Sequence, residues 1–396
     1  MRNETIIVFT MIPRYYNPLD DFIRPGKVLV IYGPRQVGKT TLIRSYVSRT
    51  PLKYRLDSGE NLAVQEVLSS QNFPAIFRYA GDNELIVIDE AQQIPNIGKA
   101  LKIIVDQLPH VRVIATGSSS FDLARNIGEP LVGRKTTLHL YPIAQLELLM
   151  QAGSQFDLMQ QLEDYLIFGS YPDTLNAVSK QEKVTYLTEL VDSYLLKDIL
   201  TLDNIKSPKA LRDLLKLLAL QVGSEVSLNE LGRQLGWNFK TVGRYLDLLE
   251  QCFVITRLGG FSRNLRSEVS RKSKYYFLDN GIRNGILQQF NPLDARNDAG
   301  SLWENFLIIE RMKYRSYANR YGNVYFWRTY TQQEIDLVED YDGMLHGYEF
   351  KWAGNKSPEV PPDWVAAYPG ATFNVINQEN YLDFVAPTEK PHRYHL

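Results

Sequence analysis

The sequence predicts a multidomain α/β protein, and three observations favour this fold class. The chain has 396 residues, a length typical of two to four domains. Its first third alternates short apolar runs with helical patterns, as in a parallel sheet covered by helices on both faces. The pattern then becomes mainly helical and ends as a mixture of helices and strands. We therefore expect four domains, over residues 1–142, 143–205, 206–278 and 279–396.

Composition excludes several classes of protein. Hydrophobic residues make up 44% and charged residues 22% of the chain, which excludes disorder over most of its length. The formal net charge is -1, which does not argue against nucleic acid as a partner, because acid elsewhere can offset a basic patch. The single cysteine, Cys252, excludes an internal disulfide and a cysteine-based metal site. We find no membrane-length apolar run and no signal peptide, so we expect a cytoplasmic protein without a membrane partner.

Continuous apolar runs indicate the central strands of the first domain. They cover residues 28–32, 85–89 and 111–116, and a further strand is expected over 136–140. None of the three runs shows the alternation of polar and apolar residues that marks a half-exposed strand. Such runs are typical of parallel strands that are buried on both faces.

The segment after the first run has the pattern of a phosphate-binding loop. Residues 33–40 read GPRQVGKT and fit G-x-x-x-x-G-K-[ST], between a buried strand and a helix. Glycines let several N–H groups face one anion, and the helix N-terminus adds partial positive charge. We expect Lys39 to contact the β- and γ-phosphates of ATP and Thr40 to ligate Mg²⁺. The expected nucleotide-binding residues are Gly33, Pro34, Arg35, Gln36, Val37, Gly38, Lys39, Thr40 and Thr41.

An acidic pair follows the second apolar run. Asp89 stands where this strand ends, so its carboxylate is expected to hold Mg²⁺. Glu90 is expected to polarise the attacking water, and the adjacent Asp-Glu pair favours hydrolysis over simple nucleotide binding. About fifty residues after a phosphate loop, this pair is stronger evidence than it is alone.

Two further positions are candidates for catalysis. Ser118, with Thr116 as second choice, ends the third strand and is predicted to sense the γ-phosphate, although an ordinary polar turn fits equally well. Arg134 precedes the next strand and is predicted to project to a subunit interface and stabilise transition-state charge in a neighbour's site. Arg125 competes with it for this role, and the alternative for Arg134 is a solvated or salt-bridged surface arginine.

With these motifs, the chain resembles the AAA+ superfamily. More closely, it resembles prokaryotic AAA-type ATPases that join a P-loop domain to a C-terminal domain of unknown function. The matching features are GPRQVGKTTL (Walker A), LIVIDEAQ (Walker B), ATGSSS, and Gly-Arg before Tyr141-Pro142, in this order. The resemblance implies ATP binding and hydrolysis in a ring or other oligomer. The helical stretch over 143–205 would be the lid or linker, but we see no clear second sensor arginine in it.

A helix-turn-helix is predicted in the middle of the chain. Ser227 begins a short helix and forms a capping box with Glu230, and a turn over 236–238 leads to a second helix over 239–250. The inward positions of the second helix are Val242, Leu246 and Leu249, and its other face carries Lys240, Thr241, Arg244 and Tyr245, as in a recognition helix. Strands over 253–258 and 274–278 would form the wing.

Charge supports DNA as the partner of this winged helix. Residues 206–274 contain 13 Lys+Arg and 6 Asp+Glu, a net charge of +7. Such clustering is typical of phosphate contacts. The alternative is a winged helix that contacts only protein. The expected DNA-binding residues are Lys240, Arg244, Arg263, Arg266, Arg271 and Lys272, and Lys274 belongs to the same basic stretch.

The last domain carries a pattern of acids that resembles restriction-endonuclease-like (PD-(D/E)XK) folds. Glu304 lies on a helix, Asp336 on a strand, and Glu349-Phe-Lys351 on the next strand. Asp336 and Glu349 would hold a divalent metal (Mg or Mn), Glu304 would support it, and Lys351 would orient the nucleophile. The alternatives are a binding-only descendant of the fold and surface hairpins with solvated charge.

The expected architecture is therefore a P-loop parallel-sheet ATPase core, a helical lid, a winged helix and a restriction-endonuclease-like α+β domain. The function that this predicts is an ATP-hydrolysing AAA+-type ATPase that self-associates and acts with DNA, coupled to a nuclease-like C-terminal domain. Two other interpretations stay open. One is a nucleotide-switched regulator, and the other is a protein-assembly module whose C-terminal domain only contacts partner proteins.

Overall fold

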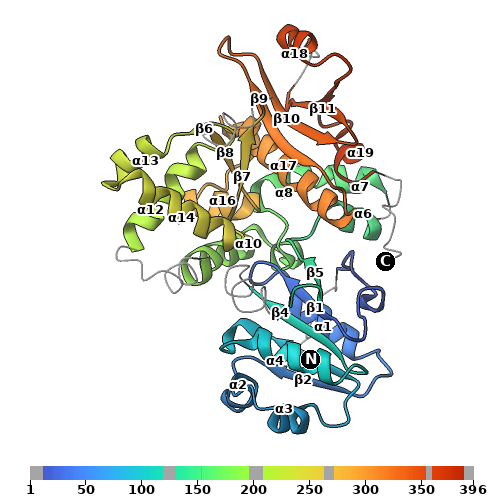
Figure 1. Cartoon of the computed structure of the whole chain (residues 1–396). Coiled ribbons are helices and arrows are strands. Elements are labelled where there is room, and N and C mark those ends of the chain that lie inside the picture. Colours follow the sequence, from blue (N-terminus) through green and yellow to red (C-terminus); the bar gives the residue numbers. More distant parts are fainter. Residues whose placement is uncertain are drawn as a thin grey trace, which may run out of the picture. The chain divides into compact units, whose positions relative to one another are not determined.

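The computed structural model describes residues 12–118, 131–152, 154–195, 208–262, 272–353 and 359–387. Its contacts divide the chain into two compact units (Figure 1). The N-terminal unit comprises Tyr16–Pro142 and Leu248–Val254. The C-terminal unit comprises Ile143–Asp247 and, among the described residues, those from Ile255 onward and those before Tyr16. The expected division into four domains stays a prediction.

The N-terminal unit is built on a five-stranded sheet in the order β2-β3-β4-β1-β5, and every neighbouring pair is parallel. This confirms the parallel α/β core that the apolar runs predict. The strands are β1 (Val28–Tyr32), β2 (Tyr54–Ser58), β3 (Leu85–Asp89), β4 (Arg112–Gly117) and β5 (Lys135–His139). The helices are α1 (Lys39–Val47), α2 (Leu62–Ser69), α3 (Phe73–Ala80) and α4 (Ile97–Gln107), with short 3-10 turns η1 (Leu19–Asp21) and η2 (Ala91–Gln93).

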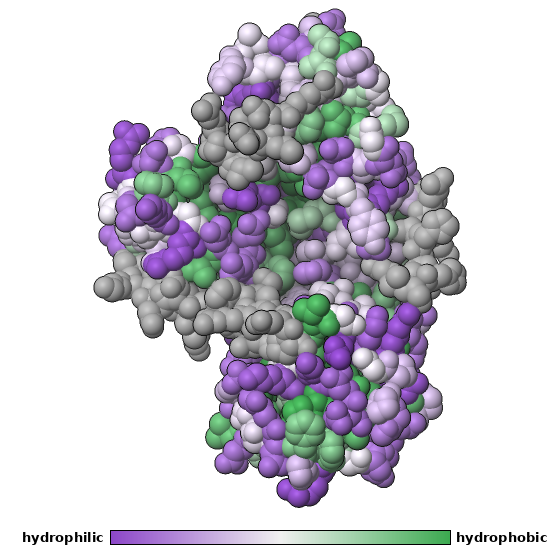
Figure 2. All heavy atoms as spheres, viewed as in Figure 1, coloured by the Kyte–Doolittle hydropathy of each residue, from purple (hydrophilic) through white to green (hydrophobic). Residues whose placement is uncertain are grey.

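Burial explains why this sheet forms from these residues. All five residues of β1 are buried, and so are the first four of β3, because helices cover both faces of the central strands. Helix α4 buries Ile97, Leu101 and Ile104, which lie on one face at helical spacing. Apolar side chains remain exposed at the edge strand β2 and on α2 and α3, where Figure 2 shows apolar atoms on the surface.

Helices make up the first half of the C-terminal unit. Among the described residues, no helix of either unit combines the length and the apolar character that crossing a membrane requires. The first helices are α6 (Gln145–Gln151), α7 (Gln155–Gln160), α8 (Leu162–Phe168), α9 (Pro172–Asn176), α10 (Lys180–Glu189), the π-helix η3 (Leu190–Leu195) and α12 (Pro208–Leu220). They are followed by α13 (Leu228–Leu235), α14 (Phe239–Gln251), α16 (Asn280–Leu287), η4 (Leu293–Ala295), α17 (Ala299–Tyr317), α18 (Pro362–Ala367) and α19 (Tyr381–Val385). The residues of α14 from Leu248 on are counted with the N-terminal unit.

A seven-stranded sheet in the order β12-β11-β10-β9-β7-β8-β6 runs through the rest of this unit. Its strands are β6 (Glu225–Val226), β7 (Ile255–Gly260), β8 (Ser273–Phe277), β9 (Asn323–Arg328), β10 (Glu334–Tyr341), β11 (Met344–Phe350) and β12 (Thr372–Ile376). Strand β7 pairs with β9 in parallel and so joins the strands of the predicted wing to those of the predicted nuclease-like domain. The expected boundary at residue 278 therefore falls inside a continuous sheet.

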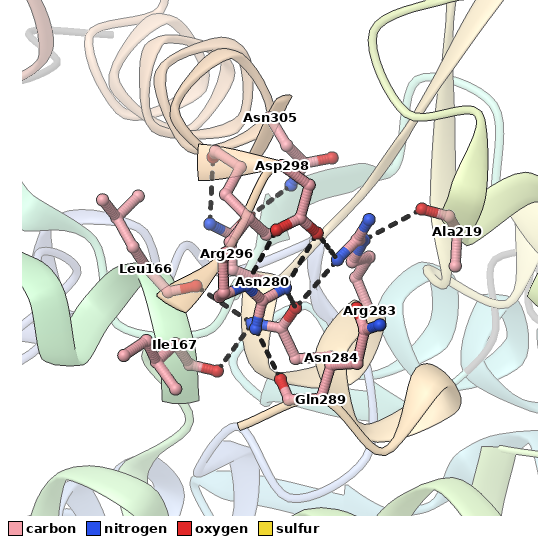
Figure 3. Close-up of polar contacts among 11 residues, drawn as sticks. Leu166, Ile167, Ala219, Asn280, Arg283, Asn284, Gln289, Arg296, Asp298 and Asn305 are labelled. Atoms are coloured by element: carbon pink, nitrogen blue, oxygen red, sulfur yellow. Dashed lines mark hydrogen bonds and ion pairs between the residues drawn. The ribbon is translucent and has the colours of Figure 1, made fainter. Parts of the chain in front are cut away.

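A buried polar network joins the helices of the C-terminal unit around α16 (Figure 3). Arg283 donates from Nε to the carbonyl of Ala219 at 2.9 Å, and the Nδ2 of Asn284 reaches the carbonyl of Ile167 at 2.8 Å. Asp298 accepts from Arg283 Nη1 at 2.5 Å and from Arg296 Nε at 2.8 Å. The network thus gives hydrogen bonds to carbonyls at helix ends and pairs charges that would be costly to bury without a partner.

Opposing effects set the charges in this network. Burial raises the pKa of Asp298, but the hydrogen bonds from Arg296 and the charge of Arg283 outweigh it and bring the pKa to about 2. Burial lowers the pKa of Arg283, and this effect exceeds the stabilising charge of Asp298.

Candidate functional site

The predicted phosphate loop lies between β1 and α1, and its backbone has a tightly curved path. A Cβ atom at Gly33 would lie 2.0 Å from the carbonyl oxygen of Leu140, so only glycine fits there. Gly38 has a φ of 94°, in the left-handed region that glycine adopts at little cost. The side chain of Lys39 is 5% exposed, and its ammonium donates to the carbonyl oxygens of Gly33 at 2.9 Å and Pro34 at 2.7 Å. Lys39 therefore lies across the loop.

Asp89, at the end of β3, accepts hydrogen bonds both from the residue after the loop lysine and from the end of the neighbouring strand β4. The hydroxyl of Thr40 donates to its Oδ2 at 2.7 Å, and the hydroxyl of Thr116 donates to its Oδ1. The start of helix α1 and the ends of the parallel strands β3 and β4 thus place a hydroxyl, a carboxylate and a second hydroxyl at one edge of the sheet. Carboxylate and hydroxyl oxygens are the ligands that Mg²⁺ takes beside nucleotide phosphates, so Thr40 and Asp89 fit the expected ion.

Glu90 and Ser118 are brought together by Gln92, the last residue of the LIVIDEAQ motif, for which the sequence predicted no role. The Nε2 of Gln92 donates both to Glu90 Oε2 and to Ser118 Oγ, the latter at 3.1 Å. Glu90 itself has a φ of 50°, and its N–H donates to Thr116 Oγ1 at 3.1 Å. The tight turn η2 after Glu90 returns the chain toward the strand ends. The sequence signal for this contact was the order Asp-Glu-Ala-Gln over residues 89–92, because a glutamine two residues after Glu90 can reach back across the turn to its carboxylate.

Arg134 forms an ion pair with Asp106 of α4 and is 44% exposed. Both residues belong to the N-terminal unit, and a salt-bridged surface arginine is the alternative that the sequence left open. The competing Arg125 lies outside the described residues. A role of Arg134 in a neighbour's site stays a prediction.

The predicted recognition helix is α14, and it buries Val242, Leu246 and Leu249. Lys240 and Arg244 are exposed, as a phosphate-contacting face requires. Lys272, beside β8, is 64% exposed and pairs with Glu225 at 2.6 Å. The predicted residues Arg263, Arg266 and Arg271 lie outside the described residues.

Tyr245 does not share the open face of α14, and that expectation was wrong. It is 6% exposed and packs against Trp237, with ring centroids 4.8 Å apart. Tyr245 lies three residues after Val242 and four before Leu249, so it falls on the same apolar stripe. Its ring closes the turn between α13 and α14.

The predicted nuclease residues lie on α17, β10 and the end of β11. The N–H of Phe350 donates to Asp336 Oδ2 at 2.7 Å, and Lys351 Nζ lies 2.7 Å from Glu349 Oε1. Burial raises the pKa of Asp336 well above its ordinary value, and the charges of Glu304 and Glu349 raise it further. The three carboxylates are therefore close enough to repel one another. We call Glu304, Glu334, Asp336 and Glu349 the carboxylate cluster.

Lys274 lies inside the carboxylate cluster, and placing it in an exposed basic stretch was wrong. It is 1% exposed, and its Nζ lies 2.6 Å from Glu334 Oε1 and 3.1 Å from Glu304 Oε1. Tyr276, two residues along β8 on the same face, donates its hydroxyl to Glu304 Oε1 at 2.7 Å. Over the described ranges, no group of three or more His, Cys, Asp or Glu side chains is arranged to hold a metal ion. This donor set does not fit the second divalent ion that the sequence predicts.

Comparison with known families agrees with the phosphate loop and its partners. Residues 25–149 match an AAA domain. Residues 159–293 match a Domain of unknown function (DUF8612), and residues 299–380 match a Domain of unknown function (DUF4143). The resemblance to AAA-type P-loop ATPases with a C-terminal domain of unknown function is thus confirmed, and ATP is the nucleotide that this domain type binds.

Similar chains occur in bacteria and archaea. An "Uncharacterized protein" of Mycobacterium tuberculosis is 28% identical over 328 residues, covering 82% of this chain and 70% of that protein. One of Haemophilus influenzae is 26% identical over 344 residues, covering 82% of each chain. One of Methanocaldococcus jannaschii is 23% identical over 342 residues, covering 79% of this chain and 72% of that protein.

Two solved structures are also similar in part. A DNA replication initiation factor is 16% identical, with a TM-score of 0.24, over 57% of this chain and 83% of that chain. A Signal Transduction ATPase with Numerous Domains protein from Pyrococcus horikoshii, with a tetratricopeptide repeat sensor, is 15% identical, with a TM-score of 0.24, over 76% of this chain and 46% of that chain. With TM-scores this low, neither structure bears on the function of this chain.

Proposed function

We propose that the protein is an ATPase that binds and hydrolyses ATP with Mg²⁺ in its N-terminal unit. The proposal rests on the positions of Lys39, Thr40 and Asp89 at one edge of the parallel sheet. Lys39 hydrogen-bonds to the phosphate loop, and Thr40 hydrogen-bonds to Asp89. Nucleotides bind to open parallel sheets at this edge, where strand ends and helix N-termini meet. The match of residues 25–149 to an AAA domain supports the same site.

Each of these residues has a part in hydrolysis. Lys39 exchanges its contacts with the loop carbonyls for the phosphate oxygens of ATP. Thr40 and Asp89 would hold the Mg²⁺, which would neutralise phosphate charge when bound. Glu90 accepts a proton from the attacking water, and Gln92 fixes the carboxylate of Glu90 relative to Ser118.

The test of this proposal separates binding from turnover. Lys39→Ala should weaken ATP binding by about tenfold or more, because no ammonium then faces the phosphates. Glu90→Gln should keep nucleotide binding and lower turnover by on the order of a hundredfold, because it loses only the base. Isothermal titration with ATP and a phosphate-release assay measure the two effects, with Lys99→Ala on the exposed face of α4 as the matched control. Near-wild-type hydrolysis by Lys39→Ala would refute the proposal.

We further propose that the C-terminal unit contains a winged helix that binds duplex DNA, and that nucleotide state and DNA binding are coupled. The order α12, β6, α13, α14, β7, β8 is that of a winged helix, and exposed Lys240 and Arg244 stand on the helix in the recognition position. Lys274 is buried and does not add to the surface charge, and the remaining 12 Lys+Arg against 6 Asp+Glu over residues 206–274 still support a phosphate-rich partner.

Measuring ATP turnover with and without duplex DNA tests this second proposal. Stimulation that disappears in Lys240→Gln/Arg244→Gln would support it. If DNA neither binds at low salt nor changes turnover, the protein is instead a nucleotide-switched regulator or a protein-assembly module whose C-terminal unit contacts proteins.

A further inference from the structure

The carboxylate cluster of the C-terminal unit already contains a cation from the chain itself. Lys274 Nζ stands between Glu334 Oε1 at 2.6 Å and Glu304 Oε1 at 3.1 Å, and it lies 5.4 Å from the centre of the Phe326 ring. An ammonium taken out of water is strongly destabilising unless opposite charges surround it. The two carboxylates and the aromatic face supply this compensation.

The main chain holds Lys274 at this position. Strand β8 is an interior strand, and Lys274 pairs with Leu258 of β7 on one side and with Glu225 of β6 on the other. Its side chain is 1% exposed. Strand pairing on both sides thus fixes the backbone from which this buried ammonium projects.

The other two predicted metal ligands each have one oxygen engaged by a donor of the chain, whereas Glu349 Oε2 is buried without a hydrogen-bond partner. Lys351 Nζ lies 2.7 Å from Glu349 Oε1, and the N–H of Phe350 donates to Asp336 Oδ2 at 2.7 Å. A divalent ion of the Mg²⁺ or Mn²⁺ kind needs several oxygens converging at about 2.0–2.2 Å and free of competing cations. Here such an ion would have to displace Lys274 and Lys351 from the carboxylates it needs.

We propose that the Lys274 ammonium is a built-in counter-ion that takes the place of a divalent metal in the carboxylate cluster, so that this domain does not cleave nucleic acid. The cation comes from the segment that matches one domain family (159–293), and its carboxylate partners come from the segment that matches another (299–380). The pairing therefore depends on the two segments sharing one sheet. It also fastens β8 to β10 and α17. This inference is independent of ATP hydrolysis, which uses residues of the other unit.

A divalent-metal titration of the whole, nucleotide-free chain tests the proposal. Mn²⁺ binding is measured by electron paramagnetic resonance on the wild type and on Asp336→Asn, and the difference isolates the cluster from the ATP site. We expect no difference between these two chains. A Mn²⁺ ion bound by the wild type and lost in Asp336→Asn would overturn the proposal. So would cleavage of DNA or RNA that needs both Mn²⁺ and Asp336.

Removing the ammonium should open the cluster to metal. We expect Lys274→Met to bind one additional Mn²⁺ at least about tenfold more tightly than the wild type, and to lose it when Asp336→Asn is added. Mn²⁺ should also raise the melting temperature of Lys274→Met, because ligand binding to the folded state stabilises it. Arg257→Met, which removes an exposed base from the neighbouring strand β7, is the matched control and should gain no metal.

If Lys274→Met does not fold, Lys274→Gln is used in its place. The comparison of Mn²⁺ binding between the wild type and Asp336→Asn does not depend on either Lys274 variant. Folded Lys274 variants that bind no more Mn²⁺ than the wild type would contradict the proposal. Metal binding by the wild type would overturn it and leave the ATPase untouched. Loss of ATP hydrolysis in Lys39→Ala has no bearing on the cluster.

Discussion

Gln92 shows that the nucleotide site also depends on a motif residue for which the sequence predicted no role. Asp89 is held by the hydroxyls of Thr40 and Thr116, whereas the carboxylate of Glu90 depends on the amide of Gln92. Among the described residues, no donor lies within hydrogen-bond distance of Gln92 Oε1, although that atom is buried. A buried acceptor in this state is costly. A water or a substrate group that reaches the site would relieve this cost.

Replacing Gln92 should separate positioning from binding. We expect Gln92→Ala to lower kcat by about tenfold, because Glu90 is no longer held in one orientation toward the attacking water. Its affinity for ATP should stay unchanged, since Lys39 and the loop remain. Steady-state kinetics and ATP titration measure the two quantities, and the exposed neighbour Gln93→Ala is the control. Equal kcat values for the two variants would show that Gln92 has no positioning role.

At the scale of elements, α16 and the start of α17 are held by charges rather than by apolar contacts alone. Arg283 and Arg296 converge on Asp298 (Figure 3). The pKa of Asp298 is lowered to about 2, so its ionised form stabilises the folded state. This contribution is present above the unfolded-state value near 4 and is lost as the pH falls through the folded-state value.

Asp298→Asn tests the contribution of this network. We expect the free energy of unfolding at pH 7 to fall by about 1–2 kcal/mol, after a discount for the partial exposure of the carboxylate. The difference from the wild type should shrink as the pH is lowered from 5 toward 2. Urea unfolding over this range measures it, with the exposed Asp294→Asn as the control. A difference that does not depend on pH would mean that shape rather than charge makes the contribution.

The exposed bases of α14 give a prediction for DNA binding. The slope of log K against log salt should become shallower by about 0.9 for every phosphate that the protein no longer neutralises. Lys240→Gln/Arg244→Gln removes at most two phosphate contacts and should therefore make the slope shallower by up to twice this amount. Replacing Arg263, Arg266 and Arg271 with Gln should make the slope shallower still. Fluorescence anisotropy at several salt concentrations measures the slope. Lys209→Gln, an exposed change on α12, should leave it unaltered.

At the scale of the whole molecule, replacing Arg134 tests whether the protein self-associates to hydrolyse ATP. Arg134 lies just before β5, its side chain is 44% exposed, and it forms an ion pair with Asp106. An exposed ion pair of this kind is worth little and can exchange for another partner. A phosphate of a neighbouring chain's ATP would offer a stronger one.

If Arg134 acts on a neighbour, Arg134→Ala should lower turnover and leave ATP binding intact. Mixing it with Lys39→Ala should restore part of the activity at mixed interfaces, because each chain supplies what the other lacks. The wild-type rate per chain should also rise with protein concentration. A monomeric wild type whose rate does not depend on concentration would rule this role out.

The N-terminal sheet was largely predictable because its strands are buried. The runs over 28–32, 85–89 and 111–116 correspond to β1, β3 and β4, since strands covered on both faces need apolar residues at every position. Strand β2 was missed. It is one of the two edge strands, its residues alternate between exposed and half-buried, and no continuous apolar run marks it.

The C-terminal sheet was predictable only in part, because β6, β12 and the joining of its strands into one sheet were not expected from the sequence. β9, β10 and β11 follow from local alternation and a short turn. The parallel pairing of β7 with β9, and of β11 with β12, joins segments far apart along the chain. Local pattern carries no information on such pairings, because they depend on which edges remain free after the helices have packed.

The phosphate loop, the acidic pair at the end of β3 and the buried strands could be predicted from the amino-acid sequence, because these features depend on residues that are near one another along the chain. The roles of the charged side chains in the C-terminal unit became visible only in the folded chain. Lys274 looked like one more base of an exposed stretch, and Asp336 and Glu349 looked like free metal ligands. Folding places that ammonium between Glu304 and Glu334, and a buried charge acts through the partners that share its low-dielectric surroundings rather than through its neighbours in sequence.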